Sequence, residues 1–178
     1  MRSVGRTDIG LVRKINEDSF LCEKLEGVDN TYLYIVADGM GGHNAGEVAS
    51  SMGVQETTSY IKQNFEKITS GDEDILDLIR KAVLRANDII YKTSLIESNC
   101  TGMGTTLSMA LIKDNAMYAG HVGDSRIYLI RDKEIKRLTE DHSLVAELIK
   151  NGSIKPEEAN NHPQKNVITR ALGTEYTL

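Results

Sequence analysis

The segment TYLYIVADGMGGH, residues 31–43, contains the clearest structural signal in this chain. Its first part, residues 31–37, is a short and continuously apolar run, which is typical of a β-strand buried on both faces. The run ends at Asp38, and the glycines that follow predict a tight loop at the end of the strand. A helix is expected next, over residues 47–65, where apolar side chains recur broadly at helical spacing although Gly53 weakens the pattern. The segment therefore predicts a strand, a glycine-rich loop and a helix, with a carboxylate held at the loop.

The patterns on either side of this segment predict separate groups of helices and strands. A clearer helix is expected from an N-cap at Ser70 or Asp72 to about Ile96. The other expected strands form an antiparallel arrangement with short turns, and they cover residues 19–24, 105–111, 116–122, 126–130 and 134–138. Beyond them we expect a short helix from Asp141 or Ser143 to Gly152, a helical turn at Pro156 and a strand over 167–172. The fold class is therefore α+β, with an antiparallel sheet core and helices on its outside.

Composition limits the classes of function. The 178 residues are 40% hydrophobic and contain no repeat or linker, so we expect one globular domain. A formal net charge of -5 argues against a nucleic-acid binder with a broad basic face. No apolar run approaches the ~18 residues of a membrane span, and no signal peptide is evident, so we expect a cytoplasmic protein. Cys22 and Cys100 lie outside any metal-binding spacing, which leaves a zinc site and a disulfide framework without support.

The strongest local signal for chemistry is DGMGGH, residues 38–43. Asp38 offers the hard oxygen that Mg²⁺ and Mn²⁺ prefer, and the glycines let the backbone approach a ligand closely. An ordinary Asp-Gly turn is the alternative explanation. A dinucleotide-binding loop is disfavoured because Asn44 replaces the third glycine and because Asp38 would repel a pyrophosphate. A phosphate-binding P-loop fails because the loop has no lysine.

Two further charged segments become informative only together. RKINED, residues 13–18, is by itself explained as a solvated charged loop, and the turn in GHVGDSR, residues 120–126, explains Asp124 by turn chemistry alone. The combination of an arginine, a Glu-Asp pair, an Asp-Gly loop with a histidine and a turn aspartate, each at a strand edge, lacks such a structural explanation. It predicts a functional site.

Six segments of the chain resemble the ordered motifs of the metal-dependent protein phosphatases of type 2C. They are RKINED (13–18), VADGMGGH (36–43), GMGTT (102–106), GHVGDSR (120–126), LTEDHS (138–143) and ITRALG (168–173). The likeness extends over nearly the whole chain, and its start near Met1 is similar to the compact bacterial members that oppose serine/threonine kinases. It implies a four-layer α/β/β/α fold, in which an antiparallel β-sandwich is flanked by helices.

The resemblance also implies a metal site for two Mn²⁺ or Mg²⁺ ions, with a third bound more weakly. Asp38 would bridge two ions, and Gly39 would offer its backbone carbonyl to one of them. Glu17, together with Asp18, would orient the metal-bound water. Asp124 would help to hold the third ion.

The implied reaction is hydrolysis of phosphoserine and phosphothreonine in proteins by in-line attack of a metal-bridging water. Arg13 would bind the substrate phosphate through its bidentate fork, and His43 would be the general acid for the leaving alkoxide. Phosphorylated proteins are the expected partners, with an opposing serine/threonine kinase, no nucleic acid and a monomeric enzyme. The alternative is a catalytically inactive phosphoprotein-binding or regulatory domain.

Other parts of the chain receive smaller expectations. His121 is assigned to the core or to a supporting position, and His142 and His162 to cap and loop positions. Residues 146–166 match the place of a mobile flap beside the active site, although a plain surface loop is an equal interpretation. The family continues with an Asp-Gly and a Gly-Asp-Asn motif that carry two more metal carboxylates. We therefore expect residues 1–178 to be a C-terminally truncated phosphatase domain with little activity by itself.

Overall fold

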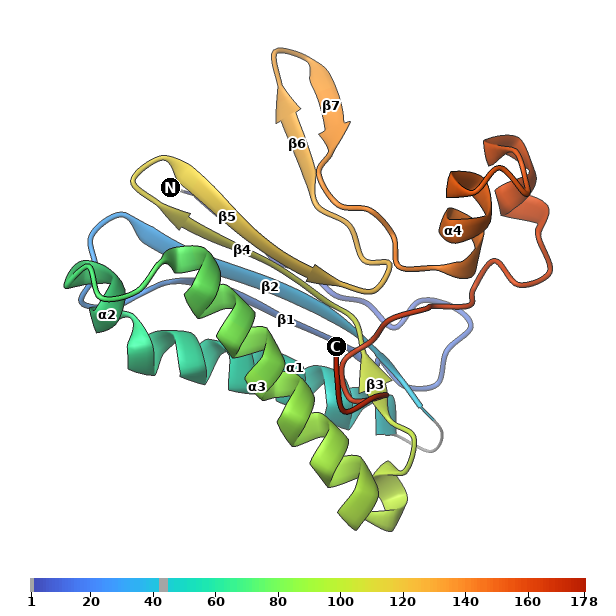
Figure 1. The fold of residues 1–178 in the computed structure, drawn as a ribbon, viewed down its shortest axis with the longest axis horizontal. Helices are drawn as coiled ribbons and strands as arrows, with labels where there is room; N and C mark the ends of the chain where they lie inside the picture. Colours follow the sequence, from blue (N-terminus) through green and yellow to red (C-terminus); the bar gives the residue numbers. More distant parts are fainter. Residues whose placement is uncertain (1, 42–44) are drawn as a thin grey trace.

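The computed structural model describes residues 2–41 and 45–178. Its main sheet is antiparallel, and its strands follow the order β1-β2-β4-β5, with β3 paired to the end of β2. These strands are β1 (Asp18–Lys24), β2 (Thr31–Met40), β3 (Gly104–Thr105), β4 (Leu107–Lys113) and β5 (Ala116–Val122). The helices α1 (Ala45–Asn64) and α3 (Ile75–Ile96) cover one side of this sheet, and α2 (Glu66–Thr69) connects them (Figure 1). The mixed α+β class with antiparallel sheets is confirmed.

Strand β2 differs from its sequence prediction in two ways. Its residues alternate, with Leu33 and Ile35 buried against the helices while Val36 on the other face is 47% exposed, so the strand is not buried on both faces. It also continues through Asp38 to Met40, because β1 pairs with it on one side and β3 on the other. A continuous apolar run cannot distinguish a strand buried on both faces from one buried on a single face, since exposed valines and tyrosines also favour strands.

Helix α1 lies close to the sheet because its buried face is built from small residues. They include Ala45, Gly46, Ala49, Ser50 and Gly53. Gly53, which weakens the helix in isolation, is explained by this packing, because a Cβ atom there would come within 3.2 Å of the Thr105 Cγ2 atom. Close approach of helix and sheet therefore takes precedence over helix propensity at this position.

The N-cap of helix α3 is Asp74, which follows both of the predicted N-caps, Ser70 and Asp72. The side chain of Asp74 accepts a hydrogen bond from the Leu76 backbone N–H at 2.7 Å and caps the helix. Ser70 instead donates its hydroxyl to Asp72 within the preceding turn. All three are good capping residues, so the choice among them depends on where the apolar face of α3 meets the sheet.

The meander predicted after β5 is wrong. Asp114 and Asn115, with φ of 48° and 68°, close the β4–β5 hairpin as expected. Strands β6 (Tyr128–Arg131) and β7 (Glu134–Arg137), however, form a separate two-stranded sheet. The chain leaves the main sheet after β5 because the backbone between β5 and β6 bonds to residues 138–142 instead, as Leu138 donates to Ile127 O at 2.8 Å.

The last part of the described chain has little regular structure. Ser143, one of the two predicted caps, begins α4 (Leu144–Lys150), and a short helical turn η2 (Pro156–Asn161) follows, while η1 (Ser98–Cys100) precedes β3. Residues 167–172 do not form the predicted strand but make two isolated bridges, Ser143 to Ile168 and Thr105 to Leu172. Within the described ranges, no helix has both the length and the apolar character needed to cross a membrane.

Candidate active site

Two aspartates face each other on neighbouring strands at the edge of the sheet. The β1–β2 register places Asp18 directly opposite Asp38, and both side chains lie on the open face, away from α1 and α3. Like charges directly opposite each other on antiparallel strands are destabilising. The pair therefore has no structural benefit as it stands, and a bound cation would remove the repulsion.

The electrostatics of Asp38 show which other groups gather here. Partial burial raises the pKa of Asp38, and the carboxylates of Asp18 and then Asp124 raise it further. The positive charge of Arg13 acts in the opposite direction, and Glu17 adds a smaller increase. The structure thus brings together the five predicted charged residues from three distant segments.

Glycines at the start of α1 allow the helix to meet the end of β2. A Cβ atom on Gly39 would lie 2.0 Å from the Gly46 carbonyl oxygen, and one on Gly46 would lie 2.4 Å from Glu17 Oε1. The Gly39 N–H also donates to Glu17 O at 3.0 Å. Close backbone packing therefore places the Glu17 carboxylate against the first turn of α1, where the helix dipole favours negative charge.

Replacing Gly46 by alanine is expected to destabilise the protein by about 1–3 kcal/mol, because the added methyl must displace the Glu17 carboxylate or the backbone of Gly39. Thermal unfolding of the metal-free protein measures the effect. The control is Ser51→Ala, on the less buried side of α1. A glycine such as Gly71 would not serve, because its positive φ makes alanine unfavourable there. Equal unfolding temperatures for Gly46→Ala and Ser51→Ala would contradict the tight packing.

Two threonines that the sequence analysis gave no role hold the backbone of Asp38. Thr106 accepts a hydrogen bond from the Asp38 N–H at its Oγ1 atom, at 2.9 Å, and donates its own N–H to Asp38 O at 2.9 Å. The Thr105 hydroxyl donates to the same carbonyl at 3.0 Å. The sequence feature that points to these hydrogen bonds is the GMGTT segment, since two threonines after a glycine turn place hydroxyls on both faces of a strand.

Thr106 also connects Asp38 to the turn that carries Asp124. Its Oγ1 atom lies 2.8 Å from Ser125 Oγ, and a Cβ atom on Gly123 would come within 2.6 Å of the Thr106 Cγ2 atom. Gly123 has a φ of 105°, which only glycine adopts readily. The turn is therefore packed directly against Thr106, the residue that binds the backbone of Asp38.

The predicted phosphate-binding arginine lies beside this group. Arg13 Nη1 is 3.8 Å from Glu17 Oε2, while 76% of the arginine side chain is exposed. Its fork is thus near the carboxylates but remains accessible to a ligand. His43, the predicted general acid, lies outside the described residues.

The donors at the site fit a hard divalent cation. Glu17, Asp18, Asp38 and Asp124 offer only oxygen, which Mg²⁺ and Mn²⁺ prefer, and the pKa of Asp38 is raised by its partial burial and by the negative charges around it. Within residues 2–41 and 45–178, no three acidic, histidine or cysteine side chains already lie close enough to hold an ion together. A bound ion would therefore have to draw these carboxylates nearer to one another.

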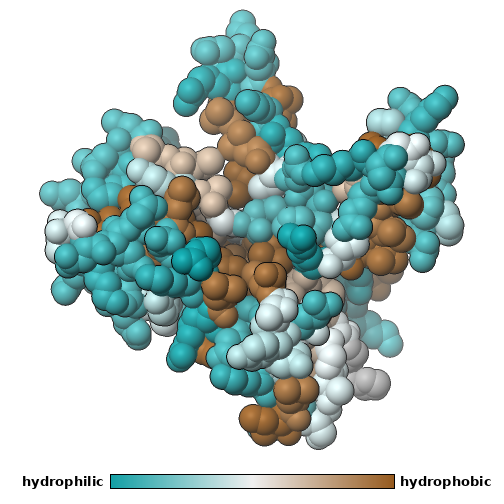
Figure 2. Space-filling model, viewed as in Figure 1, coloured by the Kyte–Doolittle hydropathy of each residue, from teal (hydrophilic) through white to brown (hydrophobic). Residues whose placement is uncertain are grey.

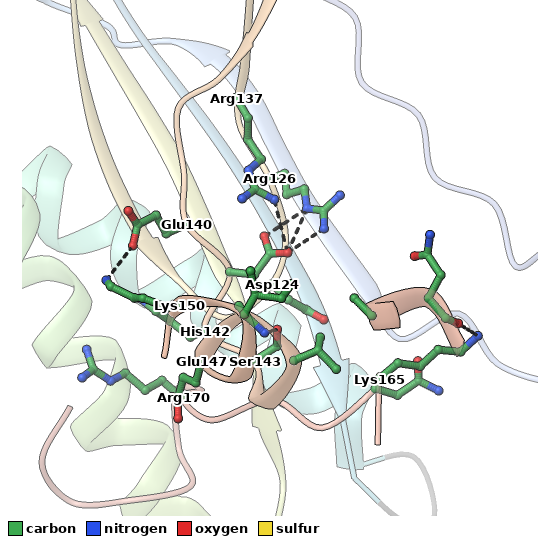
Figure 3. A pocket seen from close by; sticks show the side chains of 17 residues that line it. Asp124, Arg126, Arg137, Glu140, His142, Ser143, Glu147, Lys150, Lys165 and Arg170 are labelled. Atoms are coloured by element: carbon green, nitrogen blue, oxygen red, sulfur yellow. Dashed lines mark hydrogen bonds and ion pairs between the residues drawn. The ribbon is translucent and has the colours of Figure 1, made fainter. Parts of the chain in front are cut away.

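A polar cleft of about 880 Å³ opens next to Asp124, between the β6–β7 hairpin and α4, where the surface is hollowed (Figure 2). Arg126 and Arg137 converge on one side of it, and both bind Asp141, at 2.6 and 3.4 Å (Figure 3). Partial burial would by itself raise the pKa of Asp141, but the hydrogen bonds and positive charge of Arg126, together with the charge of Arg137, outweigh burial and leave the pKa lowered. The cleft thus has a firmly ionised wall.

Comparison with known proteins assigns this arrangement to a family. The family model described as protein phosphatase 2C matches residues 12–171. The serine/threonine phosphatase stp of Listeria monocytogenes is 43% identical over 175 residues, which are 98% of this chain and 68% of that protein. Protein phosphatase PhpP of Streptococcus pneumoniae is 39% identical over 168 residues, 94% of this chain and 65% of that protein.

Solved structures agree in fold. The serine/threonine phosphatase PstP/Ppp of Mycobacterium tuberculosis matches with a TM-score of 0.80 at 39% identity, covering 96% of this chain and 67% of that one. The catalytic domain of PstP in complex with two manganese ions matches with a TM-score of 0.74 at 38% identity, covering 96% of this chain and 66% of that one. With its motifs in order and this likeness over nearly its full length, the chain belongs to the protein phosphatase 2C family.

Proposed function

We propose that the carboxylates at the ends of β1 and β2 form the metal centre of a phosphatase that hydrolyses phosphoserine and phosphothreonine in proteins. The observation that carries this proposal is the opposed pair Asp18 and Asp38, with the pKa of Asp38 raised by burial and by the carboxylates around it. Such a group is poorly stable without a cation. Two Mn²⁺ or Mg²⁺ ions at Asp38 and the Gly39 carbonyl, with a third at Asp124, are the occupants we propose.

When bound, these ions would supply an activated water and positive charge beside the phosphoryl oxygens. The residues of the chain then divide the remaining tasks. Glu17 and Asp18 would orient the water through hydrogen bonds, and Arg13 would hold the substrate phosphate with two parallel N–H groups. His43 would protonate the departing serine or threonine oxygen.

Hydrolysis of a phosphothreonine peptide by the full-length gene product should vanish on chelation and return on addition of Mn²⁺, because the attacking water is proposed to be activated by the bound ions. Release of inorganic phosphate measures this. Undiminished turnover in thoroughly chelated protein would overturn the metal mechanism. Tight binding of the peptide without turnover in Mn²⁺ would favour the inactive binding domain, which no described contact favours at present.

Arg13→Lys should weaken substrate binding, with an increase of about tenfold or more in KM, while Mn²⁺ affinity stays largely unchanged. Lysine keeps the charge but loses the fork that matches two phosphate oxygens. Steady-state kinetics on the phosphothreonine peptide, with Mn²⁺ titrations in parallel, separate the two effects. Arg131→Lys, at the exposed end of β6, is the matched control. An unchanged KM would remove Arg13 from the site.

We further propose that the enzyme acts as a monomer on proteins phosphorylated by an opposing serine/threonine kinase. Residues 146–166, which border the cleft with α4 and η2, are proposed as the flap over the bound phosphoprotein. Sedimentation equilibrium at micromolar concentration checks the monomer, and a concentration-dependent increase in mass would contradict it.

A further inference from the structure

The turn that carries Asp124 is held by one residue that is 18 positions later in the chain. The Gly123 backbone N–H donates to His142 Nδ1 at 3.1 Å, and the backbone N–H of His142 donates to Gly123 O at 2.8 Å. A single histidine thus binds both polar groups of the glycine that precedes Asp124. No other contact in the described chain fixes Gly123 in this way.

Gly123 needs such a partner because of its place in the sheet. The ladder between β4 and β5 ends at the pair Leu107 and Val122, so Gly123 is the first residue beyond it. An unpaired backbone N–H at a partly buried position is costly. The ring of His142 supplies the acceptor that the strand ladder no longer provides.

The ring of His142 is itself fixed in orientation. It stacks on His121 with ring centroids 5.1 Å apart and an angle of 29° between the planes. His121 is held at both nitrogens, by Ser108 Oγ at 2.8 Å and by the Glu140 carbonyl at 3.0 Å. Because a carbonyl can only accept, His121 carries a proton on Nε2.

The contact to Gly123 also defines the proton on His142. Nδ1 can accept a hydrogen bond only when it is unprotonated, so the neutral ring carries its proton on Nε2. Burial is the main reason that the pKa of His142 is lowered, and the nearby His121 and Arg170 lower it further. The neutral form that the geometry requires is therefore also the favoured one.

We propose that His142 is a positioning residue for Asp124, which acts through Gly123 to hold the Asp124 carboxylate where it can bind the third ion, beside the group around Asp38. The inference rests on the proposed role of Asp124 as a metal ligand. It differs from a packing role because it depends on one acceptor atom. Asparagine offers a carbonyl oxygen near the position of Nδ1, whereas leucine fills space without an acceptor.

The test follows amide signals of the full-length gene product by ¹H–¹⁵N NMR during a titration with Mg²⁺, which is diamagnetic and reports locally. His142→Leu should raise the Mg²⁺ concentration for half-maximal shift of the Asp124 and Ser125 amides about tenfold. His142→Asn should stay within about threefold of the wild type. The shifts of Ala37 and Gly39 should saturate at the same concentration in all three proteins.

Further measurements distinguish a failure of the positioning role from a failure of the proposed metal centre. Asp124→Asn should abolish the Mg²⁺ response of the turn, and a response that persists would show that Asp124 is not a ligand, which overturns the proposed metal centre. A normal response in His142→Leu, or an equal loss in His142→Leu and His142→Asn, would overturn the positioning role alone. The wild type gives a test without any substitution, because the Gly123 amide must exchange with solvent far more slowly than that of exposed Gly27, and rapid exchange contradicts the contact.

Discussion

Replacing Asp38 by asparagine is expected to reduce hydrolysis of a phosphothreonine peptide by ~10³-fold or more. The amide keeps the shape of the side chain but loses the charge that we propose is shared by two ions, and several kcal/mol of transition-state stabilisation depend on those ions. Mn²⁺ titration should show weakened binding in the same variant. Activity within tenfold of the wild type would show that the metal centre lies elsewhere.

The same substitution is expected to stabilise the metal-free protein. Because the folded-state pKa of Asp38 is raised above its ordinary value of 3.8, its ionised form is disfavoured by folding. The metal-free protein should therefore lose stability as the pH rises from 3.8 through the raised pKa, and Asp38→Asn should remove this loss. A higher unfolding temperature for the variant at pH 7 than for the chelated wild type checks the sign.

The matched control for these measurements is Asp114→Asn at the far end of the same sheet. Asp114 is exposed and has a φ of 48°, a conformation that asparagine adopts well. The control should change neither turnover nor the response to Mn²⁺. A loss of activity in both variants would indicate a general effect of lowered charge.

His43→Ala is expected to lower the maximal rate on a phosphothreonine peptide by roughly 10²- to 10⁴-fold, the range for a lost general acid. A serine or threonine alkoxide needs a proton to leave, whereas nitrophenolate is stable without one. The deficit should therefore shrink on nitrophenyl phosphate. Equal losses on both substrates would contradict the assignment, and comparison within one variant needs no second control.

The two predictions for Asp38→Asn, lower activity and higher stability of the metal-free protein, describe one compromise between stability and function. The repulsion between Asp18 and Asp38 is a cost to the metal-free fold, and the same geometry provides oxygen ligands for a cation. The surrounding contacts keep the carboxylates in place despite this repulsion, since Thr106 binds both backbone groups of Asp38. Metal binding should accordingly raise the unfolding temperature.

Elements that depend on local patterns could be predicted from the amino-acid sequence. The apolar run of β2, the helical spacing of α3 and the Asp114–Asn115 turn all follow from neighbouring residues, and each is present. The order of the motifs identified the family and thereby suggested the residues that we propose for the site. Local chemistry also limited the cap of α4 to Asp141 or Ser143, and the structure uses Ser143.

Contacts between distant segments could be established only from the folded structure. The opposition of Asp18 and Asp38 depends on strand register, and a shift by one residue would turn one of them toward the helices. The departure of β6 from the main sheet and the failure of residues 167–172 to form a strand have the same origin, since both segments favour extended structure but bond to partners far along the chain. The roles of Thr106 and His142 arise only from such contacts, because a side chain's hydrogen-bond partner is set by the packing of the fold and leaves no periodic trace in the sequence.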